Sequence, residues 1–159
     1  MISFTRPASR HIGRRNASLA IFGAFALAGL AGCGGGGGTV KVDLQEFAVV
    51  PAVASVEHGK VTFTATNTGP NDAHEMVVFK TDLGVRDLPA SAEGKVDEEG
   101  AGLTFIGEIE SFDVGKTESG TFDLTAGRYV LVCNIVQDEP DGTKESHYLK
   151  GMATEFTVK

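Results

Sequence analysis

The sequence of 159 residues contains no tryptophan and only two cysteines. Two cysteines are too few for a disulfide-dense scaffold or for a zinc site with four thiolate ligands. The one apolar run near the start, residues 17–30, is shorter than the roughly 20 residues that a transmembrane helix needs. With 42% hydrophobic and 22% charged residues, the composition is that of a folded chain and not of a disordered one.

Positive charge is scarce in most of the chain. Residues 1–32 hold four arginines and no acidic residue, whereas the chain from Cys33 onward has ten basic and 21 acidic residues, a net charge of −11. The sequence therefore divides into a short basic leader and one acidic domain of roughly 120 residues, which is long enough for one hydrophobic core. Such an acidic domain excludes nucleic-acid binding through the phosphates and predicts protein partners with basic surfaces.

The leader has the three parts of an export signal. A basic segment is followed by the apolar run and then by Leu30-Ala31-Gly32-Cys33, which resembles a bacterial lipobox. The resemblance implies that residues 1–32 are a lipoprotein signal peptide and that Cys33 is lipidated as the mature N-terminus. The protein is then expected in the cell envelope, anchored to a membrane on its periplasmic or surface side. An ordinary cleaved signal with a chance cysteine is the alternative.

Five consecutive glycines follow Cys33, and such a run favours neither helix nor strand. Residues 33–38 are therefore expected to tether a domain formed by residues 39–159. If Cys33 is lipidated, Cys133 has no partner for an intrachain disulfide. A lone thiol in an oxidising compartment is a liability unless it is buried or bound to a metal.

Apolar residues in the domain recur mainly at every second position, which indicates β-strands. Val61, Phe63 and Ala65, for example, alternate with threonines. About eight short strands separated by turn signals predict an all-β, antiparallel Greek-key sandwich. Residues 82–103 interrupt the rhythm and are expected to form a long loop or a short helix over one edge. The clearest strand patterns lie at residues 40–44, 61–66, 74–81, 105–114, 120–124, 129–133 and 153–158.

Side chains that bind metals are few in this domain. Its one cysteine, Cys133, ends an expected strand, and alternation points the thiol toward the core with Tyr129 and Leu131. His147 and Met152 follow, separated by four residues. A thiolate, imidazoles and a weak thioether together are the ligands of a blue-copper electron-transfer site.

These residues resemble the ligand pattern of the cupredoxins, in particular single-domain members of the sulfocyanin or plastocyanin kind. In that family a histidine from an early strand, matched by His74, joins a Cys…His…Met cluster that Cys133, His147 and Met152 match. The resemblance implies one copper ion that cycles between Cu(I) and Cu(II). In relatives the ring edge of the second histidine reaches the surface, which implies that the electron leaves through His147.

Three features depart from the family pattern or extend it. Thirteen residues, most of them polar, separate Cys133 from His147, where most single-domain relatives have far fewer, and they are expected to form a surface excursion. Glu75 stands where many relatives have an asparagine that pins the cysteine loop, and Asn134 is a candidate for part of that brace. Tyr148 and Leu149 could either form a docking patch or pack within the loop.

The leading hypothesis is therefore a membrane-anchored electron carrier with one type 1 copper and a basic redox partner. A copper-binding or delivery protein is the first alternative, which the long segment between the ligands favours. The second is a copper-free sandwich for adhesion or assembly, in which Cys133 is an inert buried thiol. An enzyme is disfavoured because only His58 remains to build a second histidine cluster.

Overall fold

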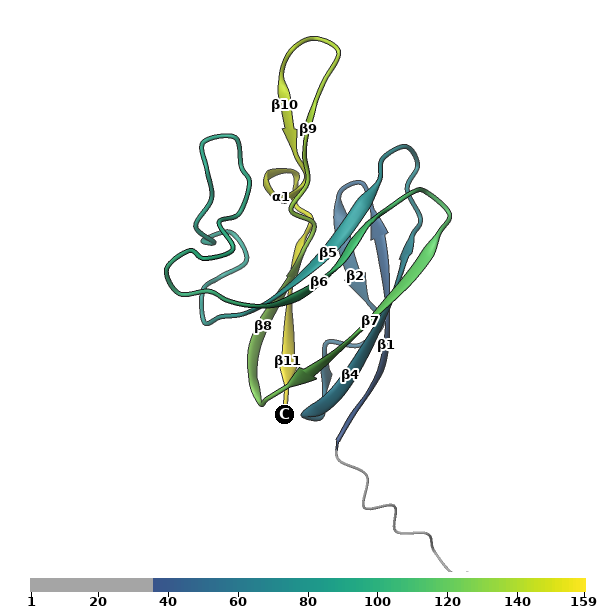
Figure 1. Cartoon of the computed structure of the whole chain (residues 1–159), viewed down its shortest axis with the longest axis vertical. Coiled ribbons are helices and arrows are strands. Elements are labelled where there is room, and N and C mark those ends of the chain that lie inside the picture. The colour runs from purple at the N-terminus through teal and green to yellow at the C-terminus, as the bar shows by residue number, and fades with distance from the viewer. Residues whose placement is uncertain (1–35) are drawn as a thin grey trace, which may run out of the picture. The chain divides into compact units, whose positions relative to one another are not determined.

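A computed structural model describes residues 36–159 as two β-sheets packed face to face, so the predicted all-β sandwich is confirmed (Figure 1). One sheet has the order β2 (Ala48–Pro51), β1 (Gly37–Gln45), β4 (Gly59–Asn67) and β7 (Thr117–Leu124). The other has the order β3 (Ser55–Val56), β11 (Ala153–Val158), β8 (Gly127–Val132), β5 (His74–Lys80) and β6 (Thr104–Phe112). A separate hairpin of β9 (Val136–Asp138) and β10 (Lys144–Ser146) leads into the four-residue helix α1 (His147–Lys150).

The sheets differ in two respects from the prediction. The structure has eleven strands among the described residues instead of about eight, because β2, β3, β9 and β10 are too short to show an alternating pattern. Two pairs of neighbours, β1 with β4 and β3 with β11, are parallel, so the sandwich is mixed and not wholly antiparallel.

The expected signal peptide, residues 1–32, and the expected lipidation site Cys33 lie outside the described residues. Within residues 36–159 no helix is long and apolar enough to cross a membrane. Gly37 and Gly38, which the sequence analysis assigned to the tether, are instead the first residues of β1 and pair with Lys60 and Val61. Glycine is needed at position 37, since φ is 106° and a Cβ would collide with the Lys60 carbonyl.

The main core lies between the two sheets and follows the predicted alternation. Val61, Phe63 and Ala65 are fully buried, and Phe63 packs edge-on against Phe156 of the opposite sheet at 5.3 Å between ring centroids. The threonines of β4 face the other way. The Thr62 hydroxyl, for example, lies 2.8 Å from that of Thr121 on β7. Hydrophobic burial therefore sets the register of this sheet, and hydroxyl pairs line its outer face.

A second, smaller core explains the long segment between β5 and β6. Strands β5 and β8 are apolar on both faces, and the outward side chains Val77 and Val132 are fully buried. Leu88 and Val96, from the expected loop 82–103, cover them. The segment contains no helix, and it covers the face of the five-stranded sheet and not an edge, since two central strands with apolar outer faces require a cover.

We predict that Phe63→Ala lowers the free energy of unfolding by about 3–5 kcal/mol, because it leaves a cavity between the sheets. The matched control is Phe105→Ala, at a side chain that is 42% exposed. That change should cost less than about 1.5 kcal/mol, mainly through the lost edge contact with Phe79. Urea unfolding followed by circular dichroism measures both, and equal losses would contradict the assignment of the core.

Candidate metal centre

Strand pairing places three of the four predicted ligands at one end of the five-stranded sheet. His74 is the first residue of β5, and Cys133 directly follows β8, its antiparallel neighbour. Met152 directly precedes β11, the other neighbour of β8, and the Cys133 amide donates to the Met152 carbonyl at 2.9 Å. Met152 is fully buried in the main core.

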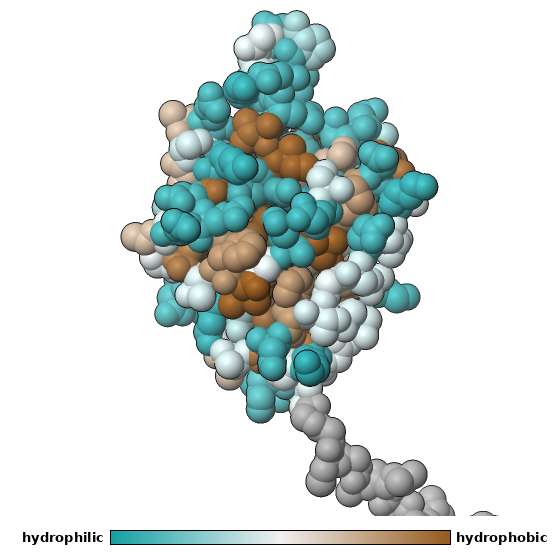
Figure 2. Space-filling model, viewed as in Figure 1, coloured by the Kyte–Doolittle hydropathy of each residue, from teal (hydrophilic) through white to brown (hydrophobic). Residues whose placement is uncertain are grey.

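The fourth predicted ligand, His147, returns to this end through the β9–β10 hairpin. The hairpin is the expected surface excursion, and its projecting tip is hydrophilic (Figures 1 and 2). Ser146 pairs with Val136 at its base, and the His147 amide donates to the Ile135 carbonyl at 3.0 Å. The 13-residue separation therefore leaves His147 beside Cys133, because the segment folds back on itself.

Three donor atoms converge in the buried space between these elements. The Cys133 Sγ lies 3.3 Å from Nδ1 of His147 and 3.8 Å from Nδ1 of His74, and the two Nδ1 atoms are 3.2 Å apart. Two donors bound at about 2.0–2.3 Å to one ion are no more than about 4.6 Å apart. All three separations meet this limit, and all three residues are fully buried. The group therefore fits one metal ion.

The protonation of the donors follows from their burial. Burial raises the pKa of Cys133 to about 12, although the backbone amides of Glu75 and Ile135 donate hydrogen bonds that act in the opposite direction. Burial lowers the pKa of both histidines, and for His74 the nearby imidazole of His147 lowers it further. At neutral pH the site without metal thus holds a thiol and two neutral imidazoles.

Asn134, the candidate brace of the cysteine loop, bonds to the segment that covers the outer face of the five-stranded sheet. Its side-chain oxygen accepts from the Val96 amide at 2.6 Å, and its side-chain nitrogen donates to the Val96 carbonyl at 3.0 Å. Ser146 adds a second link, donating to the Gly94 carbonyl at 2.8 Å. The segment that covers the outer sheet face is thereby fastened to both ends of the hairpin between two candidate ligands.

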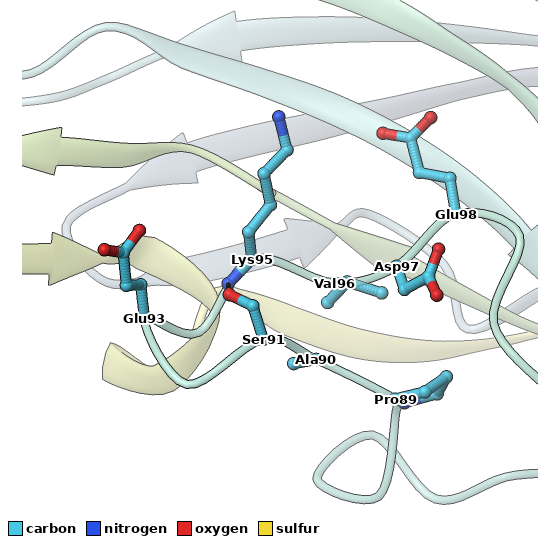
Figure 3. Close-up of a pocket in the computed structure, with 8 residues that line it drawn as sticks. All are labelled: Pro89, Ala90, Ser91, Glu93, Lys95, Val96, Asp97 and Glu98. Carbon is cyan, nitrogen blue, oxygen red and sulfur yellow. Dashed lines mark hydrogen bonds between the residues drawn. The ribbon is translucent and has the colours of Figure 1, made fainter.

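Figure 3 shows the pocket that this segment forms around residues 89–98. The side chains of Lys95 and Glu98 point to the same side of the loop there. No candidate ligand lines the pocket.

Glu75 lies among acidic side chains that include Glu98, and burial followed by the charge of Glu108 raises the pKa of Glu75.

The residues around His147 correct one expectation. The imidazole is fully buried, and its Nε2 atom has no hydrogen-bond partner among residues 36–159, so its ring edge does not reach the surface. The ring of Phe47 packs edge-on against it at 5.5 Å between centroids. Sequence reasoning missed Phe47, which lies in the turn between β1 and β2. A large aromatic residue in a two-residue turn was the only signal.

The two residues that follow His147 have different environments. Tyr148 is buried in the smaller core, and its hydroxyl accepts from the Leu88 amide at 3.2 Å, so it packs within the fold. Leu149 is 65% exposed, so it alone of this pair is free to contact another protein.

Comparison with solved structures identifies this fold as the cupredoxin fold. Auracyanin from Roseiflexus castenholzii matches with a TM-score of 0.50 and 21% identity, over 77% of this chain and 96% of that one. Auracyanin A, a "blue" copper protein from Chloroflexus aurantiacus, matches with a TM-score of 0.50 and 19% identity, over 78% of this chain and 100% of that one. No protein-family model and no curated protein matches the sequence. The fold and its buried His–Cys–His–Met group are suited to one copper ion.

We predict that one Cu(I) ion displaces about one proton when it binds to the apoprotein at pH 7, because the Cys133 thiol must ionise and the histidines are already neutral. Anaerobic titration in a pH-stat measures the release. Cys133→Ser should abolish it, and His58→Ala, a change at the surface, should not. Binding of copper with no proton release would show that the thiol is already ionised.

Proposed function

We propose that this protein carries single electrons through one type 1 copper held by His74, Cys133, His147 and Met152. The observation that carries the proposal is the convergence of the Cys133 Sγ and the two Nδ1 atoms in the buried end of a cupredoxin fold. Copper bound by these ligands supplies a one-electron couple, since thiolate and thioether stabilise Cu(I) and imidazole suits Cu(II).

The protein's own residues favour this couple in two ways. The amides of Glu75 and Ile135 point at the Cys133 sulfur and stabilise its ionised form. Backbone hydrogen bonds hold the ligands whichever charge the site carries: the amide of Met152 donates to the His147 carbonyl at 2.9 Å. A frame that is rigid in both states keeps nuclear rearrangement small, which suits electron transfer.

We further propose that the carrier is anchored outside the cytoplasm through a lipid on Cys33 and that it docks with a redox partner whose surface is basic. The lipobox at residues 30–33 and the net charge of −11 after it support these two points. Carboxylates also surround the site: Asp72 and Glu145 each place an oxygen within 4.8 Å of a His147 ring nitrogen.

The structure favours a carrier over the two alternatives. A delivery protein was suggested by the long segment between Cys133 and His147, but that segment is a paired hairpin and the donors are fully buried, which opposes rapid exchange of the ion. A copper-free sandwich gives no reason to keep a thiol and two imidazoles together in its core. His58 bonds to the Lys159 carbonyl at 2.9 Å, away from this group.

We predict that Cu(II) added to the apoprotein produces the intense visible absorption of a thiolate–copper bond. Cys133→Ser should abolish the band because it removes the thiolate. Met152→Leu should keep the band and shift the reduction potential, since the axial ligand tunes it. Visible spectroscopy and voltammetry provide the two measurements.

The matched control for the histidine ligands is His58→Ala, which should leave the spectrum unchanged, whereas His147→Ala should alter or abolish it. A wild-type protein that binds copper without colour would exclude the electron carrier and favour the delivery protein. A protein that binds no copper would exclude both.

A further inference from the structure

We propose that Phe47 is the cover of the metal centre: its ring closes the solvent side of His147, and Lys150 holds the ring in place. The residue then acts as a positioning residue that keeps water and small ligands away from the ligand imidazole. Only the role of Phe47 in a copper-loaded protein rests on the proposed function. The packing of Phe47 against His147 can be tested in the protein without copper.

The first support is the burial of His147. Its Nδ1 faces the thiol and the other histidine, and the opposite nitrogen, Nε2, is buried with no hydrogen-bond partner among the described residues. A buried polar nitrogen without a partner is costly, so the group that keeps water from it must be well fixed. Phe47 is the aromatic side chain that packs edge-on against this ring from outside the ligand group.

The second support is that the turn between β1 and β2, which carries Phe47, contacts both the loop before His74 and the loop after His147. One carboxylate oxygen of Glu46 accepts from the amides of Asn71 and Asp72, at 2.8 and 2.6 Å, just before His74 in the chain. Burial acts to raise the pKa of Glu46, but these amides outweigh it and the pKa is lowered. The turn is therefore attached to the loop that leads into the first ligand.

On the other side, Phe47 contacts the loop between His147 and Met152. The Lys150 ammonium lies 5.1 Å from the centre of the Phe47 ring and 2.9 Å from a carboxylate oxygen of Glu145. Gly151 has a φ of 120°, and a Cβ there would lie 3.3 Å from the Phe47 carbonyl oxygen, so the turn approaches this loop closely. A connected series of contacts thus runs from Glu145 through Lys150 and Phe47 to the imidazole.

The test is the reactivity of the histidines of the full-length apoprotein toward diethyl pyrocarbonate, measured residue by residue with mass spectrometry. In the wild type, exposed His58 should react, and His74 and His147 should be protected. Phe47→Ala should speed the modification of His147 by roughly tenfold or more, as expected on loss of a packed aromatic contact, and should leave His74 protected. Phe47→Leu, which keeps most of the volume, should retain the protection.

Lys150→Gln is the second variant, and it changes a side chain that is about half exposed. It should raise the reactivity of His147 alone, by a smaller factor, and Lys150→Arg should restore the protection. If His147 stays as protected as His74 in Phe47→Ala, the proposal is overturned. If that variant exposes both histidines, it has unfolded, and an unchanged His147 in Lys150→Gln then overturns the proposal.

The copper-loaded protein gives an independent readout. Imidazole added to the Cu(II) form of Phe47→Ala should change the visible spectrum, and the same addition should leave the wild type unchanged. Failure of the protein to take up copper would contradict the proposed function but leave the apoprotein result standing. Equal effects of imidazole on both proteins would contradict the cover.

Discussion

The pairing of β8 with β5 on one side and with β11 on the other is the constraint on which the site depends. Cys133 and Met152 both lie directly beside paired residues. Val132 of β8 pairs with Ala153 of β11, Cys133 follows Val132, and Met152 precedes Ala153. A slip of one residue would turn the thiol to the opposite sheet face. The register is fixed because β8 buries apolar side chains on both faces, so packing at a distance from the donors determines where they meet.

The donors contribute little to their own placement. Without metal they are neutral, since burial raises the pKa of the thiol and lowers those of the imidazoles. Backbone hydrogen bonds hold the ligand residues in position instead. They run from Cys133 to Met152, from Met152 to His147 and from His147 to Ile135. The cost of burying these polar groups is thus offset by the folding of the sandwich.

Local alternation predicted the strands because it depends on near neighbours in the sequence, whereas the set of four ligands was implied by the resemblance to the cupredoxins. The alternation of Tyr129, Leu131 and Cys133 gave the direction of the thiol, which the structure bears out. The bonds of Asn134 to Val96 and the contact of Phe47 with His147 join segments far apart in the chain, and no periodicity marks them. The loop of residues 82–103 was expected over one edge of the sandwich. Its apolar residues are too few for the sequence to indicate that it covers the outer face of β5 and β8.

The long segment between Cys133 and His147 need not loosen the site. Doubling the length of a loop costs only about 0.6 kcal/mol in closure entropy, and pairing at the base of the hairpin removes much of the remaining freedom. What the segment changes is the surface. The His147 imidazole packs against Phe47 and is flanked by the carboxylates of Asp72 and Glu145, so in the proposed carrier a partner that docks on this side would meet these three side chains before any ligand. Recognition then depends on loops that can vary while the register of the sheet keeps the ligands fixed.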